Sequence, residues 1–138
     1  MKSFETVSHN NLLDRGGAAA AAGIPAESID HLVALRIIKP LESDPEYGPL
    51  FGMEQTPMLE ILNAMSVLNV RLEEMRDMVR VMDTLGRFPA SEASGRYRIR
   101  LGMFAEALQR RPVVTTEQET SKHVLIRALT NRYTWLIA

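Results

Sequence analysis

The segment from Gly23 to Pro40, GIPAESIDHLVALRIIKP, constrains the fold more than any other part of the chain. Its apolar residues Ile29, Leu32 and Val33 recur at helical spacing and therefore share one face. The polar residues around them fall on the opposite face, which we expect to meet solvent: Glu27, Ser28, Asp30 and His31. The sequence thus predicts a helix over residues 26–35, with a stop before it at Gly23 and another after it at Pro40.

A first helix is predicted directly before this segment. The run of small residues from Gly16 to Ala22 favours helix and lets another helix approach closely. Gly23 suits the left-handed conformation that ends many helices. The expected result is a pair of short helices joined by a tight turn.

The next residues, PLESDPEYGPLFG from Pro40 to Gly52, are rich in proline, glycine and acids. This composition is typical of turns rather than of helix. We predict a short β-hairpin here, held to the core by Tyr47, Leu50 and Phe51.

Two longer helices are predicted after the hairpin. Thr56 suits the N-cap of the first helix and Pro57 suits its first helical position. A break at residues 69–71 separates this helix from a second one over residues 72–85, which Gly86 is expected to end.

The remaining residues predict two further helices. Ser91 suits the N-cap of a helix that Pro112 closes, and Thr116 with Glu119 forms a capping box for the last helix. Apolar residues of the first of these helices recur at steps of four, three and four, the seam of a helix–helix contact: Tyr97, Leu101, Phe104 and Leu108. Such a seam pairs helices either as a hairpin within the chain or across a homodimer.

These patterns divide the chain into a flexible N-terminal arm (1–11), a first domain (12–86) and a C-terminal helical hairpin or dimerisation region (90–138). The net charge of −1 hides an uneven distribution. Residues 1–60 hold four basic and nine acidic residues, a net −5, whereas residues 71–111 hold nine arginines and six acids, a net +3. We expect the two parts to face different electrostatic partners, or each other.

Composition and motifs argue against several classes of protein. The chain has no cysteine, so disulfides, thiolate metal sites and thiol redox chemistry are excluded. No stretch approaches the roughly eighteen apolar residues of a membrane span, and without a basic and apolar leader we expect a cytoplasmic protein. His9, His31 and His123 are scattered, so we expect no metal site and no cofactor. No phosphate loop, nucleophile elbow or carboxylate pair predicts an enzyme.

A family resemblance rests on the turn at Gly23-Ile24, the segment Ile37-Ile38-Lys39-Pro40, the segment Tyr47-Gly48-Pro49-Leu50-Phe51, and residues 54–79, where Leu72-Glu73-Glu74-Met75-Arg76 is the most specific piece. Over residues 12–85 the chain resembles the winged helix-turn-helix domain of the MerR family of regulators. The resemblance implies an all-α fold: a winged helix-turn-helix domain with a small β-hairpin wing, followed by two C-terminal helices.

The chain departs from the family on the surface that would read DNA. In the family the reading helix commonly carries arginine where this chain has Glu27 and Asp30, and tyrosine where it has His31. The wing arginine of the family aligns with Pro49. DNA affinity depends chiefly on neutralising phosphates, so each exchange of a cation for an anion removes an attraction and adds a repulsion.

Two functions follow as alternatives. The first is a MerR-like transcriptional regulator that binds double-stranded DNA as a homodimer, with these expected contacts: Ser28, His31, Arg36, Lys39, Arg76 and Arg80. The second is a protein-interaction adaptor that does not bind DNA, as in the chaperone-modulator proteins that share a degenerate form of this fold. In that case a basic protein partner would dock on acidic residues: Glu27, Asp30, Glu42, Asp44 and Glu46.

Overall fold

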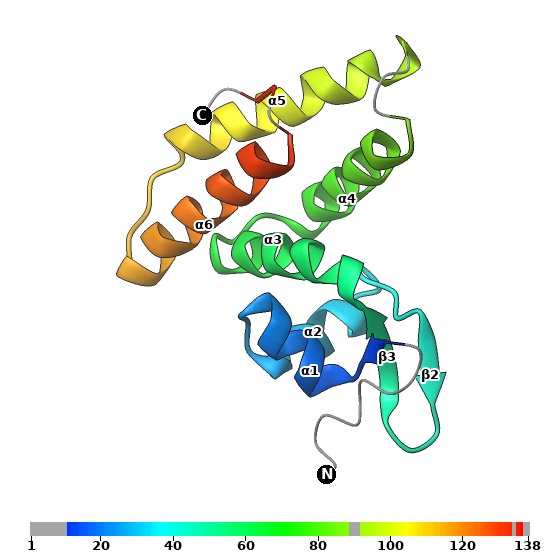
Figure 1. Cartoon of the computed structure of the whole chain (residues 1–138). Helices are drawn as coiled ribbons and strands as arrows, with labels where there is room; N and C mark the ends of the chain where they lie inside the picture. The colour runs from blue at the N-terminus through cyan, green and yellow to red at the C-terminus, as the bar shows by residue number, and fades with distance from the viewer. Residues whose placement is uncertain (1–10, 89–91, 134, 137–138) are drawn as a thin grey trace. The chain divides into compact units, whose positions relative to one another are not determined.

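The chain is mostly helical, with a small antiparallel sheet near its N-terminus (Figure 1). The computed structural model describes residues 11–88, 92–133 and 135–136. These residues form two compact units, divided between Asn63 and Ala64, inside a helix. The predicted arm over residues 1–11 and the predicted cap at Ser91 lie outside the described residues, except for Asn11.

Within the described residues the α-helices are α1 (Arg15–Ala22), α2 (Ala26–Ala34), α3 (Thr56–Val67), α4 (Leu72–Arg87), α5 (Gly95–Arg110) and α6 (Thr116–Arg132). The strands are β1 (Leu12–Leu13), β2 (Glu42–Asp44) and β3 (Gly48–Gly52), and two 3₁₀ turns are η2 (Met53–Gln55) and η3 (Glu92–Ser94). The predicted boundary after residue 86 falls inside the second unit.

The sheet of the first unit has the strand order β1-β3-β2. β2 and β3 form an antiparallel hairpin in which Asp44 is opposite Gly48, so the predicted hairpin is confirmed. β1 pairs with the other edge of β3, with Leu13 opposite Phe51, and was not predicted. Leu12, Leu13 and Phe51 are all buried, and the sheet therefore ties the start of the described chain to the core.

Helices α1 and α2 pack closely because their facing residues are small or aliphatic. Ala18, Ala19 and Ala22 of α1 are buried, as are Ile29 and Leu32 of α2. The first turn of α1 is fixed by Asp14, whose Oδ1 accepts a hydrogen bond of 2.8 Å from the Gly17 amide. α1 also contacts β3, which completes the packing of the first unit.

Three helices end in the same backbone arrangement, a Schellman motif with a left-handed residue. The left-handed residues are Gly23 (φ 71°), Arg36 (φ 59°) and Asn69 (φ 62°). In each case the next residue donates its amide to a carbonyl in the last turn, at 3.0 Å: Ile24 to Ala19, Ile37 to Leu32, and Val70 to Met65. The predicted stop at Gly23 and the predicted break at residues 69–71 are therefore confirmed, whereas a left-handed arginine was not expected.

The second unit is built around α5, against which α4 and α6 both pack (Figure 1). α5 and α6 form a helical hairpin within the chain, which was one of the two predicted uses of the seam. Leu101, Phe104 and Leu108 are buried in this unit, and Tyr97 is half-buried. These side chains are covered by the chain's own core. This corrects the prediction of a dimer seam formed by Tyr97, Leu101, Phe104 and Leu108.

Three predicted helix boundaries also need correction. α4 continues past Gly86 to Arg87, since Gly86 does not adopt a left-handed conformation. The N-cap of α6 is Thr115, not Thr116, and Thr115 Oγ1 accepts a 3.0 Å bond from the Gln118 amide. Thr56 is the first residue of α3 and not its N-cap, and its hydroxyl donates to the Met53 carbonyl at 2.9 Å.

Candidate partner-binding surfaces

The outward face of α2 carries the first group of predicted contact residues. Glu27, Asp30 and His31 are exposed, and Ser28 is half-buried. Asp30 Oδ1 accepts a 2.7 Å hydrogen bond from Arg15 Nε of α1. This bond and the charge of Arg15 lower the pKa of Asp30, and the same contact raises the pKa of Arg15. Asp30 is therefore a neutralised acid, whereas Glu27 presents its charge to solvent.

Two cations lie just after α2. Arg36 and Lys39 are exposed, and the left-handed conformation of Arg36 places it at the turn that ends the helix. The Lys39 carbonyl accepts a 2.9 Å bond from the Gln55 side chain, which holds this turn against the start of α3. A few basic residues thus adjoin the acidic face of α2.

The hairpin supplies the remaining predicted docking acids. Glu42 and Glu46 are exposed. Asp44 has a structural role, because its Oδ1 accepts bonds from the amides of Glu46 at 2.7 Å and Tyr47 at 3.0 Å. Gly48 completes the turn with a φ of 79°, a conformation that favours glycine. Glu42 and Glu46 are consequently the hairpin acids best placed to meet a partner.

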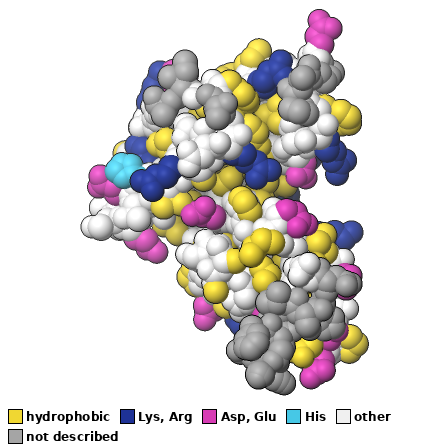
Figure 2. All heavy atoms as spheres, viewed as in Figure 1, with side chains coloured by type: hydrophobic (Ala, Val, Ile, Leu, Met, Phe, Trp, Pro, Cys, Tyr) yellow, Lys and Arg dark blue, Asp and Glu magenta, His cyan; other side chains and the backbone are white. Residues whose placement is uncertain are grey.

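The two units carry opposite charge. Residues 11–63 hold three basic and eight acidic residues, a net −5, and residues 64–136 hold twelve basic and eight acidic residues, a net +4. Figure 2 shows acidic side chains, in magenta, over the part formed by the sheet and the first helices. The net negative charge of the first unit therefore favours the approach of cationic groups over anionic ones.

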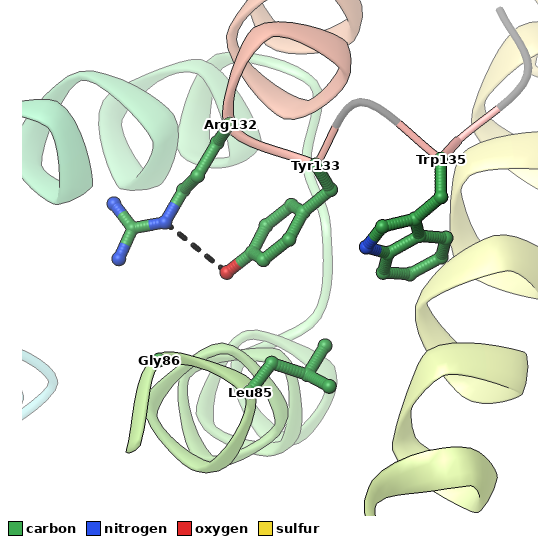
Figure 3. Close-up of a pocket in the computed structure, with 5 residues that line it drawn as sticks. All are labelled: Leu85, Gly86, Arg132, Tyr133 and Trp135. Atoms are coloured by element: carbon green, nitrogen blue, oxygen red, sulfur yellow. Dashed lines mark hydrogen bonds between the residues drawn. The ribbon is translucent and has the colours of Figure 1, made fainter. Parts of the chain in front are cut away.

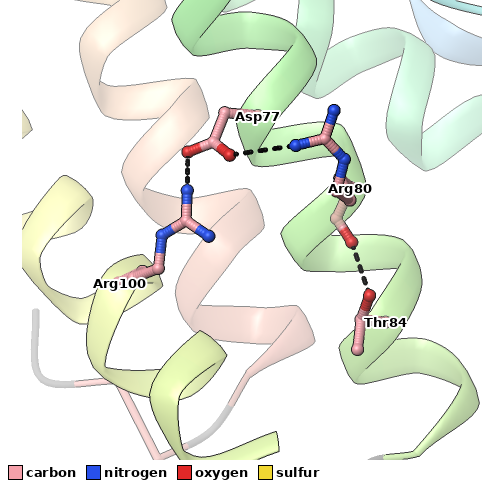
Figure 4. Close-up of polar contacts among 4 residues, drawn as sticks. All are labelled: Asp77, Arg80, Thr84 and Arg100. Carbon is pink, nitrogen blue, oxygen red and sulfur yellow. Dashed lines mark hydrogen bonds and ion pairs between the residues drawn. The ribbon is translucent and has the colours of Figure 1, made fainter.

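The predicted contacts Arg76 and Arg80 belong to the second unit, whereas the other predicted DNA contacts belong to the first. They lie on one face of α4, where they line a shallow surface hollow together with Asp83 and Arg87. Arg80 also lies 3.5 Å from Asp77, which forms a second ion pair with Arg100 of α5 (Figure 4). Asp77 therefore joins α4 to α5. Two of the unit's arginines, Arg80 and Arg100, take part in these ion pairs within the unit.

A hollow that the sequence did not predict lies beside the end of α6. It has a volume of about 280 Å³ and is lined by Leu85, Gly86, Arg132, Tyr133 and Trp135 (Figure 3). Arg132 Nε donates to the Tyr133 hydroxyl at 3.1 Å, and the Tyr133 and Trp135 rings lie 5.7 Å apart. Burial raises the pKa of Tyr133. The close spacing of one arginine and two aromatic residues in the sequence was the available signal for this cluster.

Within the part of the chain that the structure describes, no three acidic or histidine side chains come together as ligands for a metal ion. Nor does this part contain a helix of the length and apolar character needed to cross a bilayer.

Comparisons with known proteins give no relative for this chain: no family model, no curated protein and no solved structure matches it.

Proposed function

We propose that this protein is a non-catalytic adaptor, built on a MerR-like winged helix-turn-helix scaffold, that binds a basic surface of a partner protein. The order of elements supports the scaffold. Helix α1, the turn at Gly23, helix α2, the β2–β3 hairpin and the helices α3 and α4 follow one another as the resemblance implies.

The exposed acids on α2 and on the hairpin are the observation that carries the proposed function. Glu27 is exposed on α2, and Glu42 and Glu46 are exposed on the hairpin. These are the two elements that the resemblance would place against DNA. With a net charge of −5 over residues 11–63, such a surface repels phosphates and attracts lysine and arginine side chains.

Affinity capture with two matched double variants tests this function. Glu27→Lys with Glu46→Lys reverses two charges on the proposed surface. Glu117→Lys with Glu119→Lys reverses two exposed charges in the first turn of α6 and serves as the control, because it changes the net charge by the same amount. Wild type and both variants are incubated with lysate of the source cell, and the bound proteins are compared by mass spectrometry.

We expect the first variant to lose a basic protein that both wild type and the control retain. The interaction should also weaken as salt rises, since the exposed charges are screened. If the two double variants capture the same proteins as wild type, the acidic surface is not the docking site.

Double-stranded DNA is a second candidate partner, and the Arg15–Asp30 ion pair favours it. The 2.7 Å contact neutralises one of the two acids that stand where the family commonly has arginine. Arg36 and Lys39 then add two exposed cations directly after α2. On this alternative Glu27 is the main acid that opposes phosphate on the face of α2.

Retention of mixed genomic DNA across a salt series separates the two candidates. A regulator should bind at low salt and lose affinity steeply as salt rises. Glu27→Lys should then strengthen retention and Lys39→Gln should weaken it. If the wild-type protein does not retain DNA even at low salt, the regulator is excluded and the adaptor remains the proposed function.

A further inference from the structure

The hollow beside the end of α6 brings one cation and two aromatic rings together. Arg132, Tyr133 and Trp135 line it from the end of the described chain, and Leu85 and Gly86 line it from the end of α4 (Figure 3). All five residues belong to the second unit. A concave surface with apolar walls and a few polar groups is the usual form of a small-molecule site.

Arg132 carries hydrogen-bond donors that the described chain does not use. Its Nε donates to the Tyr133 hydroxyl at 3.1 Å, and Figure 3 shows both terminal nitrogens turned away from that hydroxyl. Among the described residues no carboxylate forms an ion pair with Arg132. Its terminal N–H groups are therefore available to a bound anion. A guanidinium presents them as a planar fork that matches the two oxygens of a carboxylate.

The Tyr133 hydroxyl adds a further donor beside Arg132. It accepts the bond from Arg132, so its own proton remains to be donated. In the part of the chain that the structure describes, this proton has no acceptor. Tyr133 is buried, and burial raises the pKa of its phenol, so the proton is retained at neutral pH. A buried donor without an acceptor is unfavourable, and a ligand oxygen at this place would satisfy it.

The other walls of the hollow are apolar and suit a flat ring. The Tyr133 and Trp135 rings lie 5.7 Å apart and are tilted by 56°. Trp135 is 44% exposed, so part of its ring is open to a ligand, whereas Leu85 is buried and closes the side formed by α4. Aromatic rings pack favourably in such tilted arrangements, where the edge of one ring meets the face of another.

Gly86 keeps one wall of the hollow free of a side chain. A Cβ atom there would meet nothing within 4 Å, and its φ is not left-handed, so neither packing nor backbone conformation requires a glycine. Glycine weakens a helix relative to alanine, so its presence in α4 has a cost. The hollow has a volume of about 280 Å³. Sites for drug-sized ligands span roughly 300–1,000 Å³, which indicates a ligand of one or two rings here.

We propose that this hollow binds a small aromatic carboxylate, with the carboxylate at Arg132 and the Tyr133 hydroxyl and the ring against Tyr133 and Trp135. The net charge of +4 over residues 64–136 favours the approach of an anion. The charge of Asp83 also acts on the Tyr133 hydroxyl, but among the described residues it forms no ion pair with Arg132. The site lies within the second unit and does not depend on which partner the first unit binds.

NMR titration with three matched probes tests the class of ligand. Trp135 is the single tryptophan, so its indole N–H gives one signal that reports on the hollow. Benzoate should shift this signal saturably, with a dissociation constant of about 1 mM or below. Benzamide keeps the ring without the charge and should bind about tenfold more weakly or worse. Cyclohexanecarboxylate keeps the charge without the aromatic ring and should bind about threefold more weakly or worse.

Two variants, each with a matched control, test the location. Arg132→Gln should weaken benzoate binding about tenfold or more, whereas Arg127→Gln, the same change outside the hollow on α6, should bind like wild type. Gly86→Leu adds a side chain to the wall of the hollow and should abolish binding. Gly102→Leu makes the same change at a glycine of α5 that also has nothing within 4 Å of its Cβ position, and it should bind like wild type. Circular dichroism checks that each variant keeps its helix content.

Three results would overturn the proposal. The first is a Trp135 signal that benzoate does not move at concentrations up to about 10 mM. The second is equal binding of benzoate and either benzamide or cyclohexanecarboxylate, because the site would then select neither charge nor ring. The third is a folded Arg132→Gln or Gly86→Leu variant that binds benzoate like wild type.

Discussion

Arg15 Nε lies 2.7 Å from Asp30 Oδ1, which joins the first turn of α1 to the outward face of α2. The two residues are fifteen positions apart, so the pair exists only because α1 and α2 pack against each other. One acid of the proposed docking face therefore has a partner within the chain, and the charge of that face is less negative than its sequence suggests.

The pair predicts a carboxyl group that titrates below its usual range. The hydrogen bond from Arg15 lowers the pKa of Asp30. Arg15→Gln should therefore raise that pKa toward the ordinary value, as measured by NMR titration of the side-chain carboxyl. Arg36→Gln removes a cation of the same unit that makes no such contact, and it should leave the titration of Asp30 unchanged.

The same shift fixes how stability depends on pH. A carboxyl whose pKa is lowered by folding stabilises the folded state above its unfolded pKa, and this contribution is lost as pH falls through the folded pKa. Wild type should thus be more stable than Arg15→Gln near neutral pH, and the difference should disappear well below about pH 4. A urea midpoint difference that persists in acid would show that Arg15 acts through something other than Asp30.

Replacing Arg36 with glycine is expected to stabilise the protein. Its φ of 59° is left-handed, a conformation that costs a residue with a side chain about 1 kcal/mol or more. Arg36→Gly should therefore raise the free energy of unfolding by up to about 1 kcal/mol, measured by urea denaturation. Gly23→Ala is the converse variant at the equivalent position of α1 and should lower it by about 1 kcal/mol. If Arg36→Gly destabilises the protein, then the arginine side chain makes contacts that outweigh the strain.

The inner face of α5 predicts a large loss of stability on truncation. Leu101 is fully buried, so Leu101→Ala should cost about 2–5 kcal/mol, from lost burial and from the cavity left behind. Ile99→Ala is the control on the exposed face of the same helix and should change stability by about 0.5 kcal/mol or less. Comparable effects of the two substitutions would mean that the inner face of α5 is not the core of this unit.

Tyr133 predicts a loss of stability at alkaline pH. Burial raises the pKa of Tyr133, so the folded state keeps the phenol proton at a pH where the unfolded chain releases it. That contribution to stability is complete below the unfolded pKa, about 10, and is lost as pH rises through the folded pKa. Tyr133→Phe should remove this part of the decline, and a decline that the substitution leaves unchanged would contradict the assignment to Tyr133. Fluorescence of Trp135, the single tryptophan, reports the unfolding.

The sequence predicted the local elements because their causes are local. Gly23 ends α1 whatever the rest of the fold does, because its left-handed conformation is a local property. The hairpin likewise needs only the turn residues around Gly48. The strand β1 has two residues, Leu12 and Leu13, which is too short for any alternating pattern to be visible. Its pairing depends on β3, which lies almost forty residues later.

The surfaces were harder to predict because their chemistry depends on neighbours. The spacing of Tyr97, Leu101, Phe104 and Leu108 indicates that one face of α5 is buried, but it does not say against what. From the sequence alone Asp30 is expected to be an unpaired acid, because the sequence does not show that α1 places Arg15 beside it. Likewise Asp44 reads as a docking residue until the turn amides of Glu46 and Tyr47 are seen to occupy it.

The way α2 ends has a consequence for how such a chain can change over time. The turn after α2 is closed by main-chain groups, with the Ile37 amide on the Leu32 carbonyl, and not by any side chain of the exposed face. Positions such as Glu27 and His31 can therefore be exchanged without disturbing where the helix stops. The residues that set the shape of α2 are thus separate from those that we propose to meet a partner, so on that proposal new specificity can be acquired one surface residue at a time.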